Sequence, residues 1–133
     1  MAIIYKTTDE KRLKVGDVTF VIRPLSFSEK REAEAKMSSG VAKDIMDATI
    51  LMLRYTIKSV EGIQYSDGSS FELKKRNGKV TEDAIKDLLG MEYWDTMTKV
   101  ILIKLKSFNN DTEHFDVEGK LIKKIKAPRS KKK

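Results

Sequence analysis

The sequence predicts an α+β fold: a small, mostly helical domain with an N-terminal β-hairpin and a second short hairpin. Residues 41–60 and 91–108 place apolar side chains at three- and four-residue steps, which is the period of a helix. Two dipeptides of glycine and aspartate each lie between short β-branched or aromatic runs, as in tight hairpins. The length of 133 residues corresponds to one domain that can bury its own core.

The first hairpin is predicted within residues 11–24. Apolar and charged residues alternate in KRLKV, the dipeptide Gly16-Asp17 follows, and the next run, VTFVIRP, is β-branched and aromatic. Pro24 cannot donate a hydrogen bond to a ladder, so we expect it to end the second strand.

A short, highly charged helix is predicted next, in the run SFSEKREAEAKMSSG. Ser26 and Glu29 have the spacing of a capping box, in which each side chain bonds the backbone N–H of the other residue. Gly40 is the expected stop. Apolar residues are few, so we expect a narrow buried stripe and a large solvated face.

The strongest helical signal follows in VAKDIMDATILMLRYTIKSVEG, where Gly62 is the expected end. We predict that this helix is the spine of the core. The residues that recur at helical steps are Ala42, Ile45, Met46, Thr49, Met52, Leu53, Thr56, Ile57 and Val60.

The second half of the chain predicts a hairpin, a short helix and a long helix. IQYSDGSSFEL reads as a hairpin that turns at Asp67-Gly68, and Asn77-Gly78 marks a further turn. TEDAIKDLLG is a short helix capped by Thr81, with acidic residues in its first turn. The run from 91 to 108 is expected to be the last helix.

The basic charge is concentrated at the C-terminal end. The net charge is +7, from 27 lysines and arginines and 20 acids. Residues 119–133 contain eight basic residues and no acid, so residues 1–118 carry 19 basic residues against 20 acids, a net charge of −1. We therefore expect a globular domain at 1–108 and a mobile arm at 109–133. The basic residues of this tail are Lys120, Lys123, Lys124, Lys126, Arg129, Lys131, Lys132 and Lys133.

The residues give little support to an enzyme, a metal site or a cofactor site. The sequence has no cysteine, and His114 is its one histidine, so neither a zinc site nor a catalytic triad is indicated. No phosphate-binding glycine loop appears. No apolar run is long enough to span a membrane, and the start does not resemble a secretory signal. We expect a cytoplasmic, non-enzymatic protein with no cofactor.

The order of these segments resembles the tail assembly chaperones of long-tailed bacteriophages. The likeness covers residues 17–108. It rests on the strand-to-helix run DVTFVIRPLSFSEKREAEA, an amphipathic helix, the segment SVEGIQYSDGSSFEL, the capped helix TEDAIKDLLG and a last helix. The resemblance implies a small protein without catalysis that binds the tape measure protein. Such chaperones keep that long helical chain soluble while tail tube subunits polymerise around it in the host cytoplasm.

A chaperone for helical segments needs an apolar surface that accepts another amphipathic helix. Ile50, Tyr55 and Leu102 lie away from the main apolar stripes of the two long helices, which makes them the candidates for partner binding. The alternative for each is packing against another element of the same chain. Self-association through the same surface and contact with the tail tube protein are also open.

The basic tail has three interpretations. It is a solubilising arm, which in the resembling family spans a programmed frameshift near the end of the gene. It binds nucleic acid by neutralising phosphates, with little sequence preference. Or it folds as a basic amphipathic segment against a membrane or an acidic partner, although we expect no membrane association. The alternative functions are thus a small nucleic-acid-binding phage protein or a structural tail-completion or connector protein.

Overall fold

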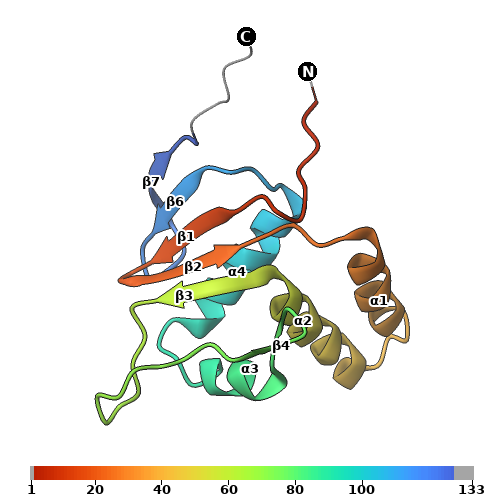
Figure 1. Ribbon diagram of the computed structural model, residues 1–133, viewed down its shortest axis with the longest axis horizontal. Helices are drawn as coiled ribbons and strands as arrows, with labels where there is room; N and C mark the ends of the chain where they lie inside the picture. Colours follow the sequence, from red (N-terminus) through yellow and green to blue (C-terminus); the bar gives the residue numbers. More distant parts are fainter. Residues whose placement is uncertain (1, 128–133) are drawn as a thin grey trace.

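The structure, a computed structural model, describes residues 2–127 as a five-stranded mixed sheet with four helices and a separate two-stranded hairpin (Figure 1). The predicted α+β class is confirmed. In chain order the elements are β1 (Lys11–Val15), β2 (Val18–Ile22), α1 (Phe27–Met37), α2 (Ala42–Thr56), β3 (Ile57–Glu61), β4 (Lys75–Arg76), β5 (Lys79–Val80), α3 (Glu82–Leu88), α4 (Trp94–Lys106), β6 (Thr112–Phe115) and β7 (Leu121–Ile125).

The sheet has the strand order β3-β2-β1-β6-β7. The N-terminal hairpin occupies its centre, with β1 and β2 antiparallel and β3 antiparallel to β2. After α4 the chain returns and lays β6 parallel to β1, and β7 then pairs antiparallel with β6. Strands from the two ends of the chain therefore lie beside each other, and β3 and β7 form the two edges.

The core lies between one face of the sheet and the helices α2, α3 and α4. Alternate strand residues point into it, which is the period of two that a half-buried strand requires. In Figure 1, α4 passes behind the sheet, while α1 and α2 form a helical hairpin at one end. The buried core residues are Leu13, Val15, Val18, Phe20, Ile22, Leu53, Ile57, Val80, Ala84, Ile85, Leu88, Trp94, Met97, Val100, Ile101 and Phe115.

Most of the locally encoded elements are confirmed. The β1–β2 connection is the two-residue turn, with Val15 paired to Val18 across it. The capping box of α1 is complete, since the Ser26 hydroxyl accepts from the Glu29 N–H and the Glu29 carboxylate accepts from the Ser26 N–H. Thr81 caps α3 by accepting from the backbone N–H three residues on.

The predicted helix over 41–60 is wrong at its C-terminal end. The helix stops at Thr56, and residues 57–61 form β3 against β2. The Arg23 N–H donates to the Thr56 carbonyl at 2.9 Å, and the Thr56 hydroxyl donates back to the Arg23 carbonyl. Ile57 and Val60 suit a helical stripe and a strand equally well, and this long-range pairing selects the strand.

The second hairpin forms later in the chain than the sequence indicates. The Asp67-Gly68 turn is present, but its arms share a single bridge, between Gln64 and Ser70, and are not strands. The two-stranded hairpin forms instead around the next turn, at Asn77-Gly78, where β4 pairs with β5.

The predicted domain boundary at 108 and the mobile arm after it are wrong for residues 109–127. These residues supply β6 and β7, two strands of the main sheet. The turn between them is fixed to α4, because the Thr96 hydroxyl donates to the Val117 carbonyl at 2.8 Å. The Asp116 carboxylate closes the turn by accepting from the N–H groups of Glu118 and Lys120. The polar, turn-rich composition of this segment thus belongs to a hairpin of the sheet and not to a mobile arm.

Candidate functional site

The ends of α1 and α2 that meet at their connection carry four exposed apolar side chains, which we name the hairpin-tip surface. It consists of Met37, Val41, Ile45 and Met46, whose exposed fractions are 40, 55, 41 and 69%. Met37 ends α1, Val41 precedes α2, and Ile45 and Met46 lie near the start of α2, so all four flank one helical connection. Gly40 makes this connection possible with a positive φ of 73°.

The three residues predicted to bind a partner do not form one exposed surface. Ile50 is half-buried and packs against the core cluster. Tyr55 donates its hydroxyl to Glu32 of α1 at 2.7 Å, and the Lys79 ammonium lies 5.0 Å from its ring centre. Leu102 is half-buried on α4. Ile50 and Tyr55 therefore contact other elements of the same chain, which is the alternative to partner binding given above.

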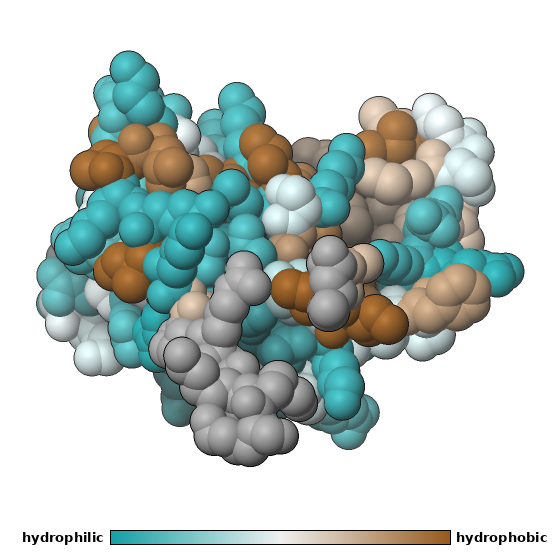
Figure 2. Space-filling view, turned by 90° about the horizontal axis from the view of Figure 1, so that it is seen from above, coloured by the Kyte–Doolittle hydropathy of each residue, from teal (hydrophilic) through white to brown (hydrophobic). Residues whose placement is uncertain are grey.

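The exposed large apolar side chains are other residues than Ile50, Tyr55 and Leu102. Figure 2 shows one face of the molecule, where apolar patches are separated by hydrophilic side chains. The sequence pattern missed Ile45 and Met46 because both fall on the apolar stripe that is predicted to be buried, and their part of the stripe lies beyond the elements that cover the rest of it. The available signal was position beside a glycine-containing connection, where fewer elements are close enough to cover a side chain.

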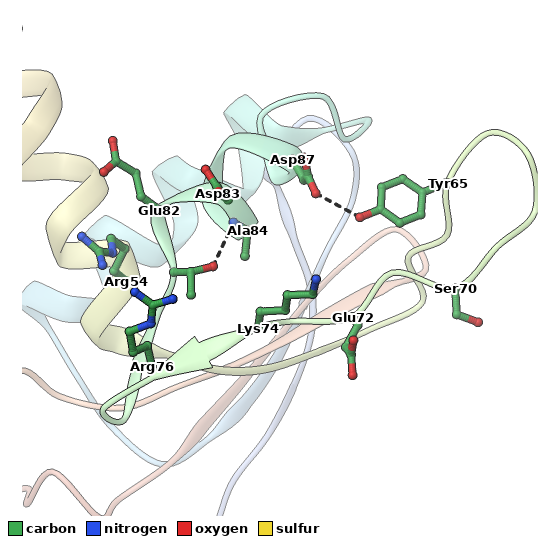
Figure 3. Close-up of a pocket in the computed structure, with 11 residues that line it drawn as sticks. Arg54, Tyr65, Ser70, Glu72, Lys74, Arg76, Glu82, Asp83, Ala84 and Asp87 are labelled. Atoms are coloured by element: carbon green, nitrogen blue, oxygen red, sulfur yellow. Dashed lines mark hydrogen bonds between the residues drawn. The ribbon is translucent and has the colours of Figure 1, made fainter.

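A groove of about 610 Å³ opens between α3 and the loop that precedes β4. Figure 3 shows Arg54 and Arg76 at one end of it and Tyr65 with Asp87 at the other. The Tyr65 hydroxyl donates to the Asp87 carboxylate at 3.0 Å, and this bond raises the pKa of the tyrosine.

The charges that line this groove are mixed. Arg54 donates through Nε to the Val80 carbonyl at 2.8 Å, which ties part of its guanidinium to the fold. Lys74 and Arg76 add positive charge, and four carboxylates offset it: Glu72, Glu82, Asp83 and Asp87. Such a lining has no single charge preference, and it brings together no base and nucleophile of a recognisable catalytic pair.

The lysines of the predicted tail divide into two groups. Lys120, Lys123, Lys124 and Lys126 lie on or beside β7 and are exposed. Lys124 pairs with Asp111 at 3.4 Å and lies 4.0 Å from Glu113. The other basic residues of the tail, Arg129, Lys131, Lys132 and Lys133, lie outside the described residues.

The outward face of the sheet carries a row of basic groups. Lys14 of β1 is in register with His114 of β6, which is in register with Lys123 of β7. Neighbouring residues on this side are partly neutralised, since Arg12 lies 3.9 Å from Glu61.

A buried charge cluster joins β1, β6 and the end of α4. Lys11 is 1% exposed and Glu113 is 2% exposed, and their charged atoms lie 3.6 Å apart. The Lys11 ammonium also donates to the Asn109 side chain at 2.7 Å and to the Asp111 carbonyl at 2.8 Å. Lys104 of α4 approaches the same Glu113 carboxylate at 2.9 Å.

The environment of Lys11 disfavours its charged form. Burial lowers the pKa of the Lys11 ammonium, the Glu113 carboxylate opposes that change, and the nearby Lys104 charge adds to it. Sequence reasoning missed this cluster. The signal was that Lys11 lies two and four residues before Leu13 and Val15, on the inward side of its strand.

The charge cluster holds the open end of the β6–β7 hairpin against β1. The Asp111 carboxylate accepts from the Ala127 N–H at 2.9 Å, a bond that lowers the pKa of Asp111. With Lys11 bound to the Asp111 carbonyl, the segment before β6 and Ala127, two residues after β7, are held together. The cluster therefore has a structural role that the strand composition alone does not reveal.

Within residues 2–127, no group of three or more carboxylate or imidazole side chains is placed to hold a metal ion. In the same range, none of the helices combines the length and the apolar character needed to cross a bilayer. Searches of family models, curated proteins and solved structures returned no match to this chain.

Proposed function

We propose that this protein is a non-enzymatic tail assembly chaperone that binds amphipathic helical segments of a tape measure protein and keeps that chain soluble while tail tube subunits polymerise around it. The proposal combines the family resemblance of residues 17–108 with the hairpin-tip surface as the place of contact. Under this proposal the protein acts in the cytoplasm of the host cell.

The observation that carries the proposal is the exposure of the hairpin-tip surface. Exposed apolar side chains that lie together on a protein surface mark binding sites more often than side chains scattered singly do. Two of the four side chains are methionines, which are flexible and adapt to partners of varied shape. A helix presented by a partner would bury these side chains against its own apolar stripe.

The test is a co-expression pull-down with the long helical product of the neighbouring gene, washed at about 0.5 M salt, where exposed charge interactions are screened. The test variant is Val41→Asp/Met46→Asp. It places two charges in the proposed contact, so we expect at least a thirtyfold loss of affinity, as for a central interface residue. The control is the single change Ile103→Asp on α4, which matches Val41→Asp because the native side chain is 59% exposed, close to the 55% of Val41.

Retention of the partner by wild type and Ile103→Asp, with loss in the double variant, would support the proposal. Loss in Ile103→Asp alone would place the contact on α4 and exclude the hairpin-tip surface. No retention by the wild type at any salt concentration would refute the chaperone function.

The second candidate function is binding of nucleic acid, which the row of Lys14, His114 and Lys123 favours. Phosphate contacts from such a row, together with the last residues of the chain, would give an affinity that falls steeply with salt. A gel shift that disappears on raising the salt, with no retention of the helical partner, would favour this candidate over the chaperone.

A further inference from the structure

The β7 edge of the sheet presents backbone and apolar side chains to solvent. All five of its residues are exposed, and Leu121, Ile122 and Ile125 have exposed fractions of 49, 66 and 45%. In an antiparallel pair, alternate residues direct their N–H and C=O groups away from the partner strand. No strand in residues 2–127 pairs with the outer side of β7. An edge of this kind is a template for another strand.

The same edge is strongly basic. Lys123 and Lys126 are exposed, and within residues 2–127 neither lies within 4.0 Å of a carboxylate. The residues from 119 to the end of the chain contain no acid. An incoming strand would thus meet unpaired ammonium groups beside an open ladder.

These charges argue against a second copy of the chain as the occupant. Antiparallel pairing of β7 with itself, centred on Lys123, would set that lysine opposite its own copy, and directly opposed like charges are destabilising. A nucleic acid would use the ammonium groups but would leave the backbone edge and the apolar side chains without partners. An extended acidic peptide offers partners to the ammonium groups, to the backbone edge and to the apolar side chains.

We propose that β7 binds an extended peptide segment in which aspartate or glutamate alternates with β-branched apolar residues, and that this segment joins the sheet as an additional strand. Main-chain hydrogen bonds to β7 supply the pairing, and the lysines select acidic side chains. The site does not depend on the chaperone function. In Figure 1, β7 and the α1–α2 hairpin lie at opposite ends of the molecule, so both surfaces can be occupied together.

The probe is a synthetic peptide of alternating glutamate and valine, about six residues long, the usual length of a strand. We expect the full chain to bind it with chemical-shift changes and slowed amide exchange on β7. A peptide with the same charges but methylated on alternate backbone nitrogens cannot complete the ladder, and we expect it not to bind.

Charge reversal tests the selectivity. Lys123→Glu/Lys126→Glu should weaken binding of the glutamate peptide by about tenfold, because a glutamate opposite position 123 would then face a like charge and the flanking charge at position 126 would also be reversed, and should create binding of a lysine–valine peptide. The matched control is Arg129→Glu/Lys131→Glu, which reverses the same number of charges beyond β7. We expect a smaller effect from the control.

Four outcomes would overturn the proposal. Equal binding of the methylated peptide would show that no strand pairing occurs. An equal effect of the control variant would show attraction to the tail charges alone. Protection of β7 by a DNA oligonucleotide that displaces the peptide at physiological salt would assign the edge to nucleic acid. A dimer of the free protein with protected β7 amides would assign it to a second copy.

Discussion

Replacing Glu113 by glutamine is expected to lower the free energy of unfolding by about 3 kcal/mol, because it leaves the buried Lys11 charge without its carboxylate. Breaking a buried ion pair by removing one partner costs about 3–5 kcal/mol in general. We take the lower figure because Lys104 has a 22% exposed side chain and can turn toward solvent, whereas Lys11 cannot.

The magnitude can be followed by thermal unfolding. For a chain of this length, about 3 kcal/mol corresponds to a fall in Tm of about 10 °C. The matched control is Asp47→Asn, an acid-to-amide change at an exposed pair, where Lys43 and Asp47 lie 3.1 Å apart with 81 and 41% of their side chains exposed. An exposed pair contributes about 1 kcal/mol or less, so the control should hardly shift Tm.

The double variant Lys11→Met/Glu113→Met separates the charge effect from the packing effect. Replacement of a whole buried pair by apolar residues is often close to neutral. We therefore expect the double variant to be more stable than Glu113→Gln. If Glu113→Gln unfolds at the same temperature as the wild type, or if the double variant is the less stable of the two, the buried-charge argument is wrong.

The same variant should change the dependence of stability on pH. Burial holds the pKa of Lys11 below the 10.5 of an exposed lysine, so between the two values the unfolded state binds more protons and stability rises with pH. Removing the opposing Glu113 charge lowers the pKa of folded Lys11 further. In Glu113→Gln, the rise in stability should therefore begin at a lower pH than in the wild type.

Three further outcomes follow from single contacts. Glu29→Gln should cost about 1–2 kcal/mol of unfolding free energy and should reduce the loss of stability below about pH 4.5. Burial raises the pKa of Glu29, but the bonds from Arg23 and from the helix cap outweigh burial and lower this pKa overall. Acid titration followed by circular dichroism measures both effects, and an unchanged acid midpoint would contradict the prediction. Gly62→Ala should cost more in urea unfolding than Gly68→Ala, since both have positive φ but only at Gly62 would a Cβ collide with a backbone carbonyl; equal costs would refute the collision. Met97→Ala, at a fully buried site, should cost about 2–5 kcal/mol by the same assay, and a change under 1 kcal/mol would mean that the core collapses around it.

The elements that the sequence predicted correctly depend on neighbouring residues. The capping box of α1 needs Ser26 and Glu29 three residues apart, and the two-residue turn at Gly16 needs a residue that tolerates positive φ. Both conditions are local, so they can be read from the chain without knowing what packs against it.

The candidate site was less predictable. Ile50 and Tyr55 appeared available because they lie off the main stripe of their helix, but whether such a residue is exposed depends on what packs beside it. Here the core takes up Ile50, and Glu32 of α1 binds Tyr55. The hairpin-tip surface is not evident from the sequence because Ile45 and Met46 fall on the apolar stripe that is predicted to be buried.

The sequence by itself determined the α+β class, the four helices apart from the C-terminal end of α2, and the central hairpin, because helical period, caps and tight turns are encoded within a few residues. The tertiary structure alone decided that residues 57–61 leave the helix and that residues 112–125 join the sheet. The physical reason is that an apolar or polar run of this length is compatible with several conformations. Pairing with β2 and β1, and the buried contact of Lys11 with Glu113, select among them, and these partners lie far away in the chain.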